Sequence, residues 1–316
     1  MNVEHTPPTG RVKNVAVLDL TSMSSPDDLA EISSIEKVAL VLVPDSLAGA
    51  LARIPMSSVA SVVPVPDGAD VKVHTGAVVM GGEALAQPGG DNVVLVVTGT
   101  LALSSPVQDV RFRQVIVTGM VLAPYGSEAA LGAGLSRVTG SVQYYRHVEG
   151  QRFKTLAGQT QLSGQSLANA GGDPSDILFI SGQTIVTGPV TEVGYQRIVA
   201  AGQLLAPRDS EAVLAPALTI EGQLVWYSGH PRFFVGKEHF SRDFFGLIDE
   251  PLSLALVGRF TFDEGVPATL LREKVSDITL VGTIIAPESL VGVLQLLTTE
   301  KHGSITVGWP DGGSQR

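Results

Sequence analysis

The stretch DITLVGTIIAPESLVGVLQLLTTEKHG, from Asp277 to Gly303, shows most clearly how this chain is built. Its apolar, β-branched run from Ile278 to Ile285 predicts a strand, with Gly282 inside it. Pro287 suits the first turn of a helix, and apolar residues at helical spacing continue through about Leu297. The stretch therefore predicts one strand followed by one short helix.

The same order of strand, turn and short helix recurs at segments that begin at Val38, Met120 and Gln203. A weaker version near the N-terminus has Ser25 as the expected helix N-cap before Pro26. Glycine recurs within apolar runs, mostly at intervals of about 20 to 24 residues, and such a period is typical of solenoids. The recurring glycines are Gly76, Gly99, Gly119, Gly140, Gly158, Gly182, Gly202, Gly222, Gly258 and Gly282.

This pattern predicts a right-handed α/β solenoid of about ten to twelve coils, each with one parallel strand plus a short helix or turn. We expect a single repeat domain over residues 12–308, a flexible N-terminal segment at 1–11 and a flexible C-terminal tail at 309–316. The layout resembles leucine-rich-repeat proteins in architecture. Because the LxxLxLxxN/C core of that family is missing, the resemblance implies the solenoid shape and no ligand site.

Four of the recurring glycines are followed by a glutamine. If the coils stack in register, these side chains form a ladder of amide hydrogen bonds. One interpretation is a polar stripe for a partner, and the other is that the ladder only joins neighbouring coils. The glutamines are Gln159, Gln183, Gln203 and Gln223.

The interval between Gly222 and Gly258 is longer than its neighbours and is rich in aromatic residues, in a chain with only 5% aromatics. We interpret residues 226–250 as an insertion that carries a contact surface, since insertions in repeat proteins often bind partners. The alternative is that the rings fill a local core. A second aromatic pair follows Gly140 at the same offset. The candidate interaction residues are Tyr144, Tyr145, Trp226, Tyr227, Phe233, Phe234, Phe240, Phe244 and Phe245.

Composition narrows the classes of function. The chain has no cysteine and a net charge of −10, so we expect no disulfide, no thiolate metal site and no nucleic-acid partner. Its polar N-terminus lacks a signal-peptide pattern and its apolar runs are too short to span a bilayer, which predicts a cytoplasmic protein without membrane insertion. His230 and His239, with Glu238 and Asp243, lack the tight spacing of a metal motif. We predict no catalytic residue, metal or cofactor.

We therefore expect a non-enzymatic structural or scaffold protein that associates with itself or presents an extended surface to another protein. The alternatives are a carbohydrate-active or other hydrolytic enzyme on the solenoid face and a monomeric protein-binding module. Self-association is expected because a solenoid ends in unpaired strands, which act as templates for another chain. The expected end strands are Val12 to Leu20 and Ser304 to Val307.

Overall fold

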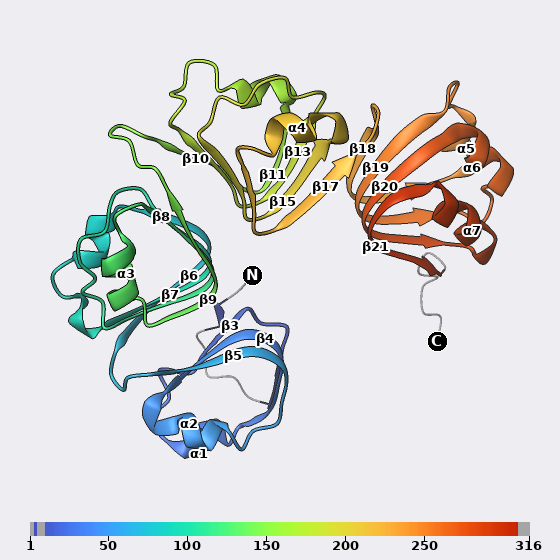
Figure 1. The fold of residues 1–316 in the computed structure, drawn as a ribbon. Coiled ribbons are helices and arrows are strands. Elements are labelled where there is room, and N and C mark those ends of the chain that lie inside the picture. The colour runs from blue at the N-terminus through green and yellow to red at the C-terminus, as the bar shows by residue number, and fades with distance from the viewer. Residues whose placement is uncertain (1–2, 5–9, 309–316) are drawn as a thin grey trace. The chain divides into compact units, whose positions relative to one another are not determined.

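A computed structural model describes residues 3–4 and 10–308 of the chain. The tail predicted at 309–316, and residues 1–2 and 5–9 of the segment predicted at 1–11, lie outside the described residues. The chain divides into two compact units, Met1–Gly150 and Gln151–Arg316. The described strands pair in parallel and form five sheets, accompanied by short helices (Figure 1). The α/β class with parallel strands is thus confirmed, but the strands do not form one long sheet.

Each unit contains two modules, a module being a group of parallel strands with its own hydrophobic core. We call each level of strands in a module a rung. The first module has the strand order β1-β3-β4-β2, and β5 also pairs with β4. Its elements are β1 (Val3–Glu4), β2 (Gly10–Lys13), β3 (Val17–Asp19), α1 (Pro26–Leu29), β4 (Ile32–Pro44), the 3-10 helix η1 (Asp45–Leu47), α2 (Ala48–Leu51) and β5 (Met56–Val65).

The N-terminal strand predicted at Val12 to Leu20 is interrupted, because Asn14 takes a φ of +60° between β2 and β3. Strand β3 lies between β1 and β4, so it is not a free edge. The N-cap prediction is confirmed at α1. There the Ser25 hydroxyl accepts a hydrogen bond from the Asp28 backbone N–H, and the Asp28 carboxylate accepts one from the Ser25 N–H.

The second module is a four-stranded sheet in the order β6-β7-β8-β9. Its strands run in register through four glycines, which pair in the order Gly76, Gly99, Gly119 and Gly140. Its elements are β6 (Asp70–Met80), η2 (Gly82–Ala86), η3 (Gly90–Asn92), β7 (Val93–Leu103), β8 (Gln114–Pro124), α3 (Glu128–Gly134) and β9 (Arg137–Tyr145).

The third module has two strands on every rung, because each rung bends at its glycine. The strands form two sheets in the orders β10-β12-β14-β16 and β11-β13-β15-β17. Its elements are β10 (Phe153–Leu156), β11 (Gln159–Ser163), η4 (Gly164–Ala168), β12 (Ile177–Ile180), β13 (Gln183–Thr187), β14 (Arg197–Ala200), β15 (Gln203–Pro207), η5 (Arg208–Ser210), α4 (Glu211–Leu214), β16 (Leu218–Ile220) and β17 (Gln223–Tyr227).

The fourth module is a four-stranded sheet in the order β18-β19-β20-β21. The strand and helix predicted around Pro287 are confirmed as β20 and α7, and the end strand predicted at Ser304 to Val307 lies within β21. Its elements are β18 (Arg232–Phe240), α5 (Arg242–Gly246), β19 (Leu252–Phe262), α6 (Ala268–Lys274), β20 (Val275–Ala286), α7 (Glu288–Leu297) and β21 (Thr298–Val307).

Residues 226–250 form part of this regular pattern instead of an insertion. They hold the first rung of the fourth module, in which Gly236 pairs with Gly258 of the next rung. Lys237, Glu238 and His239 follow Gly236, so this glycine lacks the apolar residues that come after most of the others. The long interval in the sequence is therefore the boundary between the third and fourth modules.

The modules repeat with a period of about 82 residues. Gly140, Gly222 and Gly303 all lie on last rungs, and Tyr145 and Tyr227 end the last rungs of the second and third modules. Ser127 and Ser210 are also equivalent: both are buried, and each hydroxyl accepts a backbone N–H from a residue 20 positions earlier, at 3.0 and 2.8 Å. These matching polar contacts show that the second and third modules share their detailed plan.

Close contact between backbones explains the stacked glycines. A Cβ atom on Gly119 would lie 2.0 Å from the carbonyl oxygen of Gly99, and Gly119 also has a φ of +134°. In the first module the corresponding rungs instead carry Asn14, Lys37 and Ser58, with φ values of +60°, +53° and +55°. The left-handed backbone is therefore kept there without glycine.

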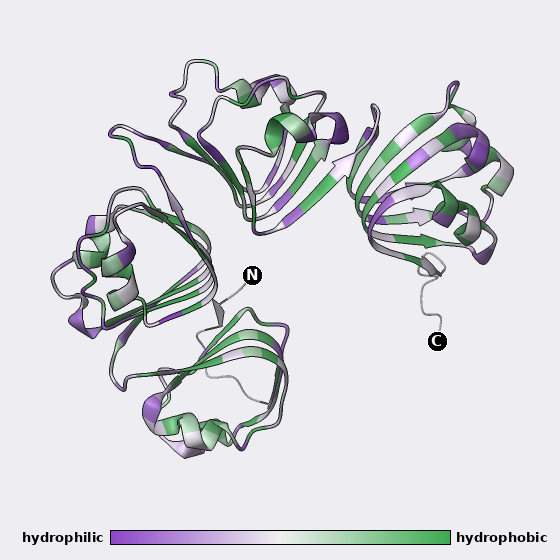
Figure 2. Ribbon diagram, in the orientation of Figure 1, coloured by the Kyte–Doolittle hydropathy of each residue, from purple (hydrophilic) through white to green (hydrophobic). Residues whose placement is uncertain are grey.

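Apolar side chains fill the space between strands and helices in every module, and Figure 2 shows long hydrophobic stretches along the strands. Within each unit, two sheet faces also pack together. In the first unit Leu40 lies in one cluster with Val94 and Val96. In the second unit Leu205 lies in one cluster with Val257. The outer rungs, in contrast, leave strand edges exposed.

Candidate functional site

The aromatic residues predicted as a contact surface lie largely in the interior. Tyr145 and Tyr227 are buried and reach back across their modules, where their hydroxyls donate to the carbonyl oxygens of Leu103 at 2.7 Å and Val186 at 2.6 Å. Burial raises the pKa of both tyrosines above the ordinary range. Each tyrosine ring therefore fills the interior of its module at the last rung.

The neighbouring residues Tyr144 and Trp226 are half-buried. Tyr144 stacks on Tyr125, with ring centroids 6.1 Å apart, and Trp226 packs against the core of the third module. The two aromatic pairs share an offset from glycine because they occupy equivalent positions in successive modules. A role of Tyr144 and Trp226 in partner contact stays a prediction.

The phenylalanines cluster around Phe240 in the fourth module. Phe240 and Phe245 are buried, and rings from β18, α5 and β19 surround Phe240 with centroids 4.9–6.0 Å away. Phe233 packs edge-on against Tyr227 at 5.2 Å. Phe233, Phe234 and Phe244 are half-buried. These contacts favour the alternative of a local core. The burial of Tyr145, Tyr227, Phe240 and Phe245 corrects the prediction of surface contact for these four side chains.

The glutamine ladder is present in the third module. Gln159, Gln183, Gln203 and Gln223 lie in register on four successive rungs. The Gln183 amide nitrogen donates to the Gln203 oxygen at 2.5 Å, and the Gln203 nitrogen donates to the Gln223 oxygen at 2.6 Å. All donors in this chain of amides thus point from the first rung toward the last.

The ladder is open at both ends. The side-chain oxygen of Gln183 is buried and has no hydrogen-bond partner among the described residues, and the Gln159 amide beside it is exposed on the edge strand β11. A shallow pocket of about 290 Å³ lies here, lined by Gln159, Gln183 and Val235 among others. At the other end, the Gln223 amide nitrogen donates to no described residue. The ladder is the candidate site. It is an aligned row of amides with an unsatisfied acceptor, the Gln183 oxygen, at its first rungs and an unused donor, the Gln223 nitrogen, at its last rung.

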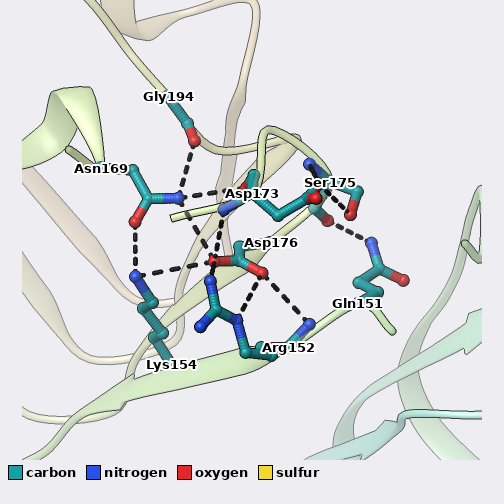
Figure 3. A network of polar contacts seen from close by, with 8 residues as sticks. All are labelled: Gln151, Arg152, Lys154, Asn169, Asp173, Ser175, Asp176 and Gly194. Atoms are coloured by element: carbon teal, nitrogen blue, oxygen red, sulfur yellow. Dashed lines mark hydrogen bonds and ion pairs between the residues drawn. The ribbon is translucent and has the colours of Figure 1, made fainter. Parts of the chain in front are cut away.

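A second polar cluster, which the sequence did not reveal, surrounds Asp176 just before β12 (Figure 3). The Asp176 side chain is fully buried. One carboxylate oxygen accepts from the Arg152 Nε at 3.2 Å, and the other accepts from the Arg152 Nη2 at 2.9 Å and the Asn169 amide at 3.3 Å. The Lys154 ammonium lies 3.6 Å from the second oxygen. Both oxygens are therefore occupied by protein donors.

Electrostatics keep Asp176 ionised. Burial is the largest single influence and favours the neutral acid, but hydrogen bonds from Arg152, the Asp173 backbone and Asn169 outweigh it together. The pKa of Asp176 consequently lies well below its ordinary value. A carboxylate held in this way does not act as a proton acceptor at neutral pH. The cluster fastens the loop before β12 to the start of β10.

The histidine pair considered as metal ligands does not assemble. His239 instead contacts Asp263, with 2.5 Å between Nε2 and Oδ1. In the described part of the chain, no group of three or more histidine or acidic side chains is arranged to hold a metal ion. No helix within residues 10–308 is both long and apolar enough to cross a membrane. Comparisons with protein-family models, with curated proteins and with solved structures found no match for this chain.

Proposed function

We propose that this protein is a non-enzymatic structural or scaffold protein that assembles with itself through the open edges of its parallel sheets. In this proposal each module is a short right-handed solenoid, and the rungs of one copy continue into the rungs of the next. One observation carries it: each sheet of the second, third and fourth modules begins and ends with a strand that no other described strand pairs with on its outer side.

The contacts between rungs inside a module support this assembly. The N–H of Gln203 donates to the carbonyl of Gly182 at 2.9 Å, and the N–H of Gln223 donates to the carbonyl of Gly202 at 2.8 Å. The last rung thus offers an outward carbonyl at Gly222, and the first rung offers an outward N–H at Gln159. Because the two ends are complementary, a second copy can add by the same hydrogen bonds that already join the rungs.

The glycine stack is complementary in the same way. A Cβ on Gly222 would lie 1.8 Å from the Gly202 oxygen, so in the third module a rung fits on its predecessor only where that position lacks a side chain. Gly76, Gly158 and Gly236 lie on first rungs and have open space at this position. A first rung is therefore shaped to receive the last rung of another molecule. Repetition of this contact generates an open, head-to-tail assembly instead of a closed ring.

Sedimentation velocity at several protein concentrations tests the proposal, with electron micrographs of the same samples. We expect the sedimentation coefficient to rise with concentration and the micrographs to contain elongated assemblies. A monomer that is independent of concentration would contradict the proposal.

A further inference from the structure

We infer that two copies of this chain join at the third module, with β17 of one copy pairing in parallel with β11 of the next and the glutamine ladder continuing across the junction. This inference rests on the proposed self-assembly and names the strands that carry it. The register inside the module places Gln223 of one copy opposite Gln159 of the other.

The direction of the amide ladder supports this junction. Donors run from Gln183 to Gln203 and from Gln203 to Gln223. The next acceptor in this direction is an amide oxygen on an added first rung, and Gln159 of a second copy supplies it. A partner entering in the opposite order would place two like groups against each other.

The buried oxygen of Gln183 gives a second, independent reason. This acceptor is shielded from solvent and has no partner in the part of the chain that the structure describes, and leaving a buried polar atom unsatisfied is unfavourable. When Gln223 of another copy donates to the Gln159 oxygen, it aligns the Gln159 amide so that its nitrogen donates to Gln183. The junction therefore satisfies a group that residues 10–308 of the single chain leave unpaired.

Apolar contact at the companion sheet of the module agrees with the same register. Leu156, Ile180, Ala200 and Ile220 occupy one position on successive rungs. Ile220, on the last rung, is one of the exposed large apolar residues of the chain. Continuation of the stack places Leu156 of the second copy against Ile220 and covers both side chains.

Disulfide trapping tests the junction, because the chain has no cysteine of its own. Thr155 and Thr219 share a position on the first and last rungs, and the junction makes them neighbours about 5 Å apart, within disulfide range. Neither residue belongs to the ladder. We expect the full-length variant Thr155→Cys/Thr219→Cys to give covalent multimers on mild oxidation. The control Thr155→Cys/Ser304→Cys, which pairs β10 with β21, should remain uncrosslinked.

Association of single ladder variants is the second measurement. Gln159→Leu and Gln223→Leu each remove one amide link and should weaken association about five-fold, whereas Gln165→Leu, in η4, should leave it unchanged. If the wild type associates but the Thr155/Thr219 pair does not crosslink, or the control pair crosslinks instead, the junction is wrong and self-assembly stands. If the wild type does not associate at all, both proposals fail.

Discussion

The second and third modules both stack glycines on successive rungs, but the glycines have different backbone conformations in the two modules. In the second module the strands run straight through Gly99 and Gly119, which have φ values of +131° and +134°. In the third module the strands break at Gly182 and Gly202, which lie outside the left-handed region. A Cβ would nevertheless lie within about 2 Å of a neighbouring carbonyl oxygen in both modules. Both modules thus need glycine because a Cβ would collide with the preceding rung. The positive φ is a second requirement, which applies to Gly99 and Gly119 but not to Gly182 and Gly202.

The largest loss of stability is expected from alanine substitution of the stacked glycines, and a comparison of two such variants distinguishes the steric requirement from the conformational one. Gly119→Ala combines a clash with the Gly99 carbonyl and an unfavourable φ, so we expect a loss of roughly 4 kcal/mol or more in the free energy of unfolding. Gly202→Ala brings only the clash with Gly182, and we expect a loss of about 3 kcal/mol. Chemical denaturation of the two variants measures the difference.

Gly132 provides a control for these substitutions, because it lies in α3 with open space around a new Cβ. Gly132→Ala should raise the free energy of unfolding by about 0.5–1 kcal/mol through helix propensity. Equal losses for Gly119→Ala and Gly202→Ala would show that the positive φ contributes nothing at Gly119.

The next effect concerns a residue that distinguishes the two modules. Asp176 and Val93 both lie six residues before the second glycine of their modules, but only Asp176 is charged and held by Arg152. Asp176→Asn replaces carboxylate acceptors by an amide whose nitrogen faces other donors. We expect a loss of about 2–3 kcal/mol at pH 7, measured by denaturation.

The pH dependence of this loss gives a sharper check. Because the pKa of Asp176 is lowered in the folded state, its stabilising effect is present above the unfolded pKa, near 4, and disappears as the pH falls toward the folded value. The difference between wild type and Asp176→Asn should therefore be constant from pH 7 to about 5 and shrink below about pH 4. A constant difference down to pH 2 would show that ionisation of Asp176 is unimportant.

A smaller effect should be the same in both modules. Ser127→Ala leaves the buried N–H of Val107 without its acceptor, and Ser210→Ala does the same to Val190. We expect each change to cost about 1–2 kcal/mol in thermal or chemical unfolding. A large inequality between the two variants would indicate that the modules are less alike than their hydrogen bonds suggest.

Local features of the fold were predictable from the sequence, and boundaries were not. Pro287 and the apolar spacing after it identified α7, and the glutamines after glycine identified the ladder, because both signals lie within a few residues. The period did not identify the module boundaries. The step from Gly140 to Gly158 resembles an ordinary coil, and the long step from Gly222 to Gly258 was interpreted as an insertion because Gly236 was not recognised. The Asp176 cluster was missed because Arg152 lies 24 residues away and meets Asp176 only through the strand register.

The first module provides the smallest and most specific test of the comparison. Lys37 lies in β4 with a φ of +53°, at the position where the other modules have glycine, and its side chain is exposed. A left-handed conformation costs a residue with a Cβ about 1–2 kcal/mol, and replacement by glycine removes this cost. Part of the resulting gain in stability is lost, because glycine has more conformational freedom in the unfolded chain. Lys37→Gly should therefore stabilise the protein by about 0.5–1 kcal/mol in chemical denaturation, whereas the neighbouring exposed change Ala39→Gly, within the same strand, should destabilise it. If Lys37→Gly also lowers stability, contacts of the lysine side chain stabilise the left-handed conformation at this position.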